Sequence, residues 1–183
     1  GVEAIKLYKA GDMRGALDRF TRAHQLIDLP TSGIWRARCL AQLGRLIEAS
    51  EQYLVVTRMT VGADVGDDNR VKHEKALADA HKERALIEPR IPKVKILLTG
   101  KLPPDVTVQL DGKDVPAALL GVFQPVNPGE HKLSVRGGGT STAKTFRAAE
   151  GSKLDIPVEL VARPAGRERP PVGPVAPDAG TSS

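Results

Sequence analysis

The fold is decided by AIKLYKAGDMRGALDRFTRA at residues 4–23 and ARCLAQLGRLIEASEQYLVV at residues 37–56, which repeat one pattern at an offset of 33 residues. Small, glycine and aromatic residues recur at matching places: Ala4 with Ala37, Gly11 with Gly44, Ala16 with Ala49, Phe20 with Tyr53. A fixed period of this length indicates a stacked array of helical hairpins. Such arrays present surfaces on which other chains bind and seldom carry chemistry of their own.

The residues that recur in each copy suit the packing of two helices. A small residue in the first helix lets the second helix approach closely, and Gly11 or Gly44 then ends the first helix. Phe20 and Tyr53 are expected to fill the space between hairpins, because one ring buries more apolar area than an aliphatic side chain. We therefore expect two packed hairpins in the first part of the chain.

The repeated pattern resembles the tetratricopeptide repeat. The likeness is carried by Tyr8, Gly11, Asp12, Ala16, Leu17, Phe20 and Ala23 in one copy and by Ala37, Leu40, Leu43, Gly44, Ala49 and Tyr53 in the other. In that family the first helix of each hairpin lines a concave groove that holds a protein or peptide. Carried over by position, the resemblance implies a partner-binding groove formed by Ile5, Tyr8, Lys9, Ile34, Arg38, Ala41 and Gln42.

Within this groove, Lys9 and Arg38 are the candidates to pair with a carboxylate or an acidic peptide. Ile5 and Ile34 are the candidates for apolar contact with the partner. The alternative is that Lys9 and Arg38 are simply solvated cations.

A third long helix is expected over residues 69–88, with Asn69 as its capping residue. Its expected apolar stripe consists of Val71, Ala76, Leu77, Ala80, Ala85 and Leu86. This helix would either solvate the end of the array or form half of a third repeat. Residues 61–68 before it are rich in turn formers and predict a loop. Residues 1–88 are thus predicted to form one helical domain.

Residues 89–93 mark a boundary, since Pro89 and Pro92 stop a helix and favour extended backbone. Beyond the boundary apolar residues alternate with polar ones, as in Val94, Ile96 and Leu98. Turn signals such as Asp111-Gly112 separate these runs. The sequence therefore predicts an α+β protein in two separate domains, with a small antiparallel β-sandwich or open barrel over residues 94–162.

Residues 94–161 resemble the PEGA domain, a small β-sandwich module of bacterial envelope and surface proteins. The likeness is carried by PPDVTVQLDG at residues 103–112, by PVNPGEHKL at residues 125–133 and by the strand after Glu150-Gly151. Residues 113–123 depart from the pattern, and residues 117–120 within them are expected to form a strand or a packed flap. The order of helical repeats, sandwich and proline-rich tail resembles multidomain proteins of myxobacteria and their relatives.

Residues 163–183 hold five of the 14 prolines and almost no large apolar side chain. We expect this tail to be disordered and to act as a spacer or merely as a terminus. Because the helical pattern already begins at Val2, we expect the chain to be a fragment or a processed product. Any membrane attachment would then come through segments absent from this chain.

Other classes of function have little support in the sequence. The net charge of +5 is spread along the chain, and aromatic residues do not alternate with basic ones, so nucleic-acid binding is not expected. Cys39 is the single cysteine and is expected to be a buried thiol. The four histidines have no metal-ligand spacing, and His131 is expected to be structural. No catalytic or phosphate-binding motif is present, so we expect neither an enzyme nor a cofactor.

The sequence thus predicts a non-enzymatic scaffold of the bacterial cell envelope, periplasmic or membrane-tethered, with a cytoplasmic location as the alternative. Its helical groove would bind a protein or peptide partner. Two other functions remain open: contact of the sandwich with a cell-wall polysaccharide, and a sensor or input segment of a larger signalling protein.

Overall fold

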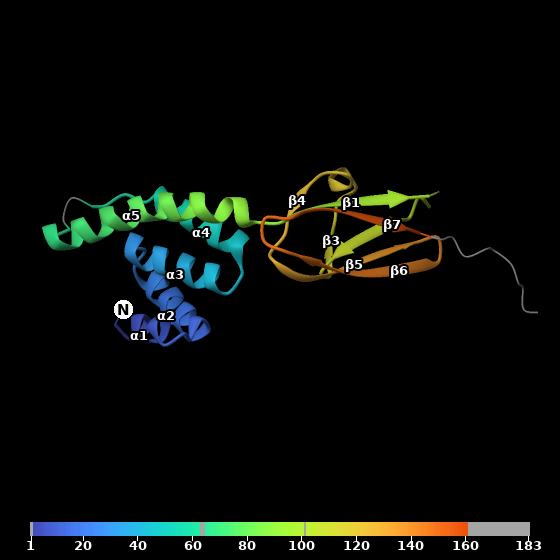
Figure 1. Cartoon of the computed structure of the whole chain (residues 1–183). Helices are drawn as coiled ribbons and strands as arrows, with labels where there is room; N and C mark the ends of the chain where they lie inside the picture. Colours follow the sequence, from blue (N-terminus) through green and yellow to red (C-terminus); the bar gives the residue numbers. More distant parts are fainter. Residues whose placement is uncertain (1, 63–64, 101, 161–183) are drawn as a thin grey trace, which may run out of the picture.

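The computed structural model describes residues 2–62, 65–100 and 102–160 and places helices at one end and strands at the other (Figure 1). This confirms a mixed α+β protein with a helical N-terminal part and a β C-terminal part. We call residues 2–87 the helical domain and residues 93–160 the β domain. The predicted tail at residues 163–183 lies outside the described residues, as do residues 63 and 64 of the predicted loop.

The described residues of the helical domain form five helices that pack on one another in chain order. They are α1 (Val2–Lys9), α2 (Met13–Leu26), α3 (Pro30–Gln42), α4 (Leu46–Thr57) and α5 (Asp67–Ile87). Gly11 and Gly44 follow α1 and α3 with φ of 84° and 73°, so both adopt the left-handed backbone that favours glycine. Asp12 caps α2 by accepting a hydrogen bond from the Gly15 amide at 2.9 Å.

The residues shared by the two copies form the helical core. Ala16, Ala37 and Ala49 are fully buried, and the rings of Phe20 and Tyr53 are nearly so. The small side chains let the helices approach closely, and the two rings fill the remaining space. The predicted packing role of the repeated residues is therefore confirmed.

Helix α5 differs from the prediction in its start and in its buried face. It begins at Asp67, after Gly66 and without a side-chain cap, so Asn69 lies inside its first turn. The buried residues are His73, Ala76, Ala80 and Ile87, spaced three, four and seven apart on one helical face. Three residues of the expected stripe point to solvent instead, namely Val71, Ala85 and Leu86.

The β domain follows a single turn of 3-10 helix, Glu88–Arg90, and contains two sheets. Its strands are β1 (Lys93–Thr99), β2 (Thr107–Leu110), β3 (Lys113–Asp114), β4 (Gln124–Pro125), β5 (Gly129–Gly137), β6 (Thr140–Ala148) and β7 (Lys153–Glu159). One sheet has the order β4-β1-β7 and the other β3-β2-β5-β6. Residues from both sheets form one apolar core that includes Val94, Ile96, Leu133, Val135, Ile156 and Val158.

The expectation of a purely antiparallel β domain is wrong for one pair of strands. β1 and β7 pair in parallel, from Lys93 opposite Lys153 to Thr99 opposite Glu159. The alternation of apolar and polar residues shows which face of a strand is buried, but it carries no information on strand direction. The pairs in the other sheet are antiparallel, and β4 also runs antiparallel to β1.

Two local predictions in the β domain have different outcomes. Asp111 and Gly112 form the two-residue turn between β2 and β3 with φ of 52° and 78°, as the Asp-Gly pair predicted. Residues 117–120 do not form a strand, since Ala117–Leu119 is a turn of 3-10 helix. Strand β6 was not predicted, because its residues include three threonines, a serine and two charged side chains and give little apolar signal.

The helical and β domains meet at Asn127, which lies just before β5. Its side-chain oxygen accepts a hydrogen bond from the Ile47 amide at 3.0 Å, and its side-chain nitrogen donates to Glu48 at 2.8 Å. The Ile47 amide belongs to the first turn of α4, where intrahelical partners are missing. Asn127 therefore caps a helix of the other domain. His131 holds this loop in place, since its Nε2 lies 2.7 Å from the Asn127 carbonyl oxygen.

Candidate functional site

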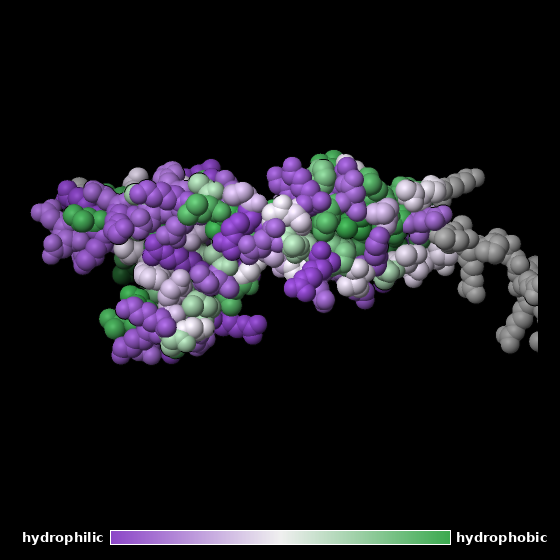
Figure 2. Space-filling view, in the orientation of Figure 1, coloured by the Kyte–Doolittle hydropathy of each residue, from purple (hydrophilic) through white to green (hydrophobic). Residues whose placement is uncertain are grey.

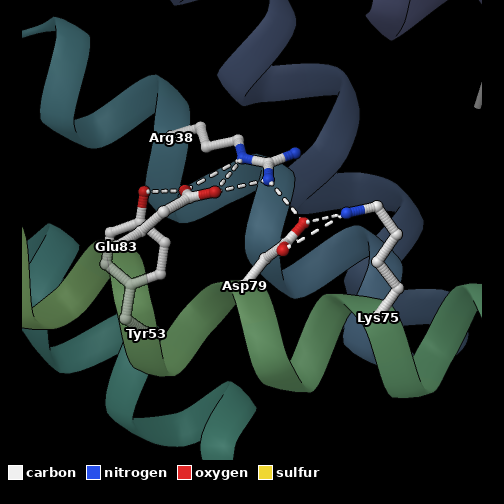
Figure 3. Close-up of polar contacts among 5 residues, drawn as sticks. All are labelled: Arg38, Tyr53, Lys75, Asp79 and Glu83. Carbon is white, nitrogen blue, oxygen red and sulfur yellow. Dashed lines mark hydrogen bonds and ion pairs between the residues drawn. The ribbon is translucent and has the colours of Figure 1, made fainter.

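The face shared by α3 and α5 carries a cluster of charged side chains centred on Arg38 (Figure 3). The Arg38 Nε donates to the two carboxylate oxygens of Glu83 at 3.1 and 3.0 Å. A terminal nitrogen of Arg38 lies 3.4 Å from Asp79, whose carboxylate also accepts from Lys75 at 3.0 Å. The cluster thus ties α3 to α5 through alternating charges.

Tyr53 extends this cluster into the core. Its hydroxyl donates to Glu83 at 2.7 Å, so Glu83 receives hydrogen bonds from both α3 and α4. Burial and the Glu83 hydrogen bond together raise the pKa of the Tyr53 phenol far above its usual value. The hydrogen bond to Glu83 likewise raises the pKa of Arg38. Both groups therefore keep their protons at neutral pH.

Two rings and a guanidinium surround the indole of Trp35, which lies on α3. Phe20 stacks on Trp35 with ring centroids 5.8 Å apart, and Tyr8 meets it edge-on at 5.0 Å. The Arg38 guanidinium carbon lies 4.8 Å from the centroid of the Trp35 ring. In the repeat, Trp35 matches Val2, so comparison of the two copies gave no signal for this residue.

Two of the predicted groove residues are used inside the protein. Ile34 is 2% exposed and belongs to the helical core, so its expected contact with a partner is corrected to a packing role. Arg38 already donates to Glu83 and Asp79 within the protein, so its expected pairing with a partner carboxylate stays a prediction. The missed signal was the spacing of Asp79 and Glu83, four residues apart on one face of α5.

The other predicted groove residues lie in mixed surroundings. Lys9 and Gln42 are exposed at the C-terminal ends of α1 and α3, while Ala41 is half-buried against the core. Tyr8 is half-buried beside Trp35, and burial raises the pKa of its phenol. The structure therefore does not bring all seven residues onto one open surface.

Ile5 faces an apolar hollow of about 390 Å³, which we call the Trp35 hollow. Its lining consists of Ile5, Phe20, Ala23, Leu26, Ile27, Leu29, Thr31, Ser32 and Trp35. Leu26 and Ile27 are 84% and 63% exposed beside this hollow, so they extend its apolar surface. Figure 2 shows hydrophobic surface beside the beginning of α1.

The single cysteine lies inside the helical core. Cys39 is fully buried, as predicted, and burial raises the pKa of its thiol to about 11. Among the described residues, no three or more histidine, cysteine, aspartate or glutamate side chains are grouped so that they could hold a metal ion. Within the same residues, no helix combines the length and apolar character needed to cross a membrane.

Comparison of the chain with known proteins adds no identification. No model of a known protein family matches the chain, and a search of curated proteins finds no match either. The likenesses to the tetratricopeptide repeat and to the PEGA domain therefore stay predictions. The candidate site rests on the geometry of the helical domain alone.

Proposed function

We propose that the chain is a non-enzymatic scaffold whose helical domain binds a protein partner at the Trp35 hollow. The observation that carries this proposal is the exposure of Leu26 and Ile27 at the rim of a hollow floored by Phe20 and Trp35. An apolar surface that a protein keeps exposed marks a contact site, and aromatic side chains are common anchors of protein interfaces.

The occupant that fits this hollow is an amphipathic helix of the partner. The hollow lies between the start of α1, the end of α2 and the start of α3. A helix with apolar residues on one face would cover Ile5, Leu26 and Ile27 together.

Of the predicted groove, this proposal keeps Ile5, Tyr8 and Lys9. Ile5 offers apolar contact inside the hollow. Lys9 is exposed on the same short helix, where it can pair with a carboxylate of the partner. Ile34 and Arg38 support the surface from within and do not contact the partner.

Site-specific photo-crosslinking tests the proposal in cells that express the protein naturally. A photoreactive amino acid replaces Leu26 in one variant and Leu86 of α5 in the matched control, because both side chains are largely exposed. We expect a discrete protein adduct from position 26 and none from position 86. The adduct should disappear when Ile5→Asp is added. Equal adducts at both positions, or none at position 26, would contradict the proposal.

We further propose that this scaffold belongs to the cell envelope. The support is the resemblance of residues 103–112 and 125–133 to a module of envelope proteins. Protease digestion of spheroplasts, with a cytoplasmic enzyme as internal control, tests the location. The full-length protein should be digested while the control enzyme survives. Protection of both proteins would place the scaffold in the cytoplasm.

Contact of the β domain with the cell wall is a second candidate, favoured by an exposed apolar loop. Leu119, Val122 and Phe123 are all exposed, and Lys95 Nζ lies 4.7 Å from the Phe123 ring centroid. Aromatic rings and adjacent cations can contact the apolar faces and acidic groups of a polysaccharide. Sedimentation of the full chain with purified peptidoglycan tests this, and Phe123→Ser should abolish sedimentation if the loop makes the contact.

A further inference from the structure

A second hollow, of about 480 Å³, lies between α2 and α4 with α3 as its floor. We call it the α2–α4 groove. Its polar lining includes Thr21 from α2, Arg36 from α3, Arg45 from the turn before α4, and Gln52 from α4. Leu17, Leu40 and Val55 supply apolar walls. This groove shares no lining residue with the Trp35 hollow.

Two hydrogen-bond donors in the α2–α4 groove are buried and have no partner in the described part of the chain. They are Arg36 Nε and Gln52 Nε2. The Gln52 side chain is only 8% exposed, so water reaches it poorly. Leaving such donors unpaired costs free energy, and native proteins rarely do so without a reason. Two unpaired donors in one hollow indicate that an acceptor group belongs there.

The charges around the groove indicate which charge the bound acceptor group should carry. Arg45 donates to Glu48 at 3.0 Å, so these two charges are already paired. Arg36 forms no ion pair within the described residues, and burial lowers its pKa while Asp28 opposes that effect. A negatively charged ligand would pair the Arg36 guanidinium. Because Glu48 and Glu51 also line the groove, one negative charge is tolerated better than two.

We propose that the α2–α4 groove binds a carboxylate of a protein partner, held by the guanidinium of Arg36 and the side-chain amide of Gln52. A carboxylate is planar and singly charged, and it matches the forked donors of arginine. The hydroxyl of Thr21 offers a third donor in the same lining. This site is separate from the Trp35 hollow and does not depend on the function proposed for it.

The groove has room for a peptide around that carboxylate. A neighbouring hollow of about 440 Å³ shares Leu17 and Arg45 with it and adds Arg14, Asp18 and Leu43, of which Asp18 is already paired with Arg22. The two hollows thus run side by side along α2 and the start of α4. The exposed Arg14 would attract further acidic residues of the same partner.

Nuclear magnetic resonance of the full chain labelled with nitrogen-15 tests the proposal, with sodium acetate as the probe. The side-chain resonances of Arg36 and Gln52 should shift and saturate with acetate, but not with sodium chloride at equal ionic strength. Arg147, an exposed arginine on β6, serves as the internal control. Shifts that are linear, that occur equally with chloride, or that are as large at Arg147 would overturn the proposal.

Two variants separate binding from folding. Gln52→Leu keeps the shape of the side chain without its donor and should weaken acetate binding about tenfold while the protein stays folded. Arg36→Lys keeps the charge without the fork and should weaken it as well. Unchanged acetate affinity in both variants would overturn the assignment of the donors.

Three short peptides identify the source of the carboxylate by competition with acetate. Competition by a tripeptide with a free C-terminus, but not by its amide, indicates a C-terminal carboxylate. Competition by an amidated peptide with an internal glutamate indicates a side-chain carboxylate. If none of the peptides competes, the proposed protein partner is overturned. A failed photo-crosslink at Leu26 would leave all these outcomes unchanged, so the two proposals can fail separately.

Discussion

The two domains differ in whether their buried polar groups have hydrogen-bond partners. In the β domain, both ring nitrogens of the buried His131 have acceptors, since Nδ1 lies 2.7 Å from Asp111 and Nε2 lies 2.7 Å from the Asn127 carbonyl. In the helical domain, Arg36 Nε and Gln52 Nε2 are buried without acceptors. A satisfied polar network stabilises one structure, whereas an unpaired buried donor costs free energy unless an acceptor binds it. The comparison supports our proposal that binding belongs to the helical domain.

The two domains also differ in how completely they bury their apolar side chains. The β domain closes two sheets over a core of branched aliphatic side chains. The helical domain packs around alanines and leaves Leu26 and Ile27 exposed next to a hollow. The β domain does expose Phe123 and its neighbours in one loop, so the contrast is one of degree.

The largest effect is expected from opening the β core. Leu133 is fully buried between the two sheets, so Leu133→Ala should lower the free energy of unfolding by about 2–5 kcal/mol. Val122→Ala, at an exposed position of the same domain, should change it by less than about 0.5 kcal/mol. Urea denaturation followed by circular dichroism gives both values. Equal losses would mean that the β core is not closed as described.

The next effect concerns the charged cluster of the helical domain. Glu83→Ala removes the acceptor of Arg38 and of the Tyr53 hydroxyl, leaving both donors poorly paired. We expect a loss of about 1–3 kcal/mol in the free energy of unfolding. Glu74→Ala, at an exposed position of the same helix, is the matched control. A loss no greater than that of the control would show that the cluster does not stabilise the contact of α3 with α5.

Because buried polar groups are unpaired in one domain and paired in the other, two glutamine substitutions should differ in their effect on the free energy of unfolding. Gln52→Leu removes an unpaired buried donor, so it should raise the free energy of unfolding by up to about 1 kcal/mol. Gln109→Leu removes a side chain that donates to Asp114 at 2.9 Å and should not stabilise the protein. Thermal melting of both variants without ligand decides the point. Destabilisation by Gln52→Leu would mean that this amide is structurally satisfied.

The smallest effect is a pH dependence from Asp111. Burial raises the pKa of this carboxyl, but hydrogen bonds from His131 and from the Lys132 amide outweigh burial, so the pKa is lowered overall. A lowered pKa in the folded state stabilises the protein above the unfolded pKa of about 3.9, and this contribution is lost as the pH falls. Because Asp111 is partly exposed, we expect only a few tenths of a kcal/mol.

Melting temperatures measured from pH 6 down to pH 3 check this dependence. Asp111→Asn, which tolerates the same left-handed turn, should reduce the acid sensitivity of the melting temperature. Glu74→Gln, at an exposed position, should keep the sensitivity of the unmodified protein. An Asp111→Asn variant with unchanged acid sensitivity would remove Asp111 from the account.

Local chemistry accounts for what the sequence could predict. Gly11 and Gly44 end helices because their positive φ is costly for other residues, and Asp111-Gly112 forms a hairpin turn for the same reason. Two prolines stop α5 and precede the first strand. The repeat itself predicted the buried alanines and rings. Each of these signals lies within a few residues of the feature that it predicts.

The remaining features depend on residues far apart in the chain. Arg38 was expected on an open groove, but Glu83 pairs with it from 45 residues away. The parallel pairing of β1 with β7 depends on the route of the chain between them, which the alternation of side chains does not encode. The α2–α4 groove went unnoticed because Arg36 and Gln52 belong to no repeated position and meet only in the fold.

The contrast between the domains is tested most directly with the partner recovered by crosslinking at position 26. Its affinity for the full chain should be measured for Leu26→Asp and for Phe123→Asp, two substitutions of exposed apolar residues, one in each domain. A helical binding surface predicts at least about tenfold weaker binding for Leu26→Asp and unchanged binding for Phe123→Asp. Weaker binding for Phe123→Asp alone would place the contact on the β domain and contradict the account.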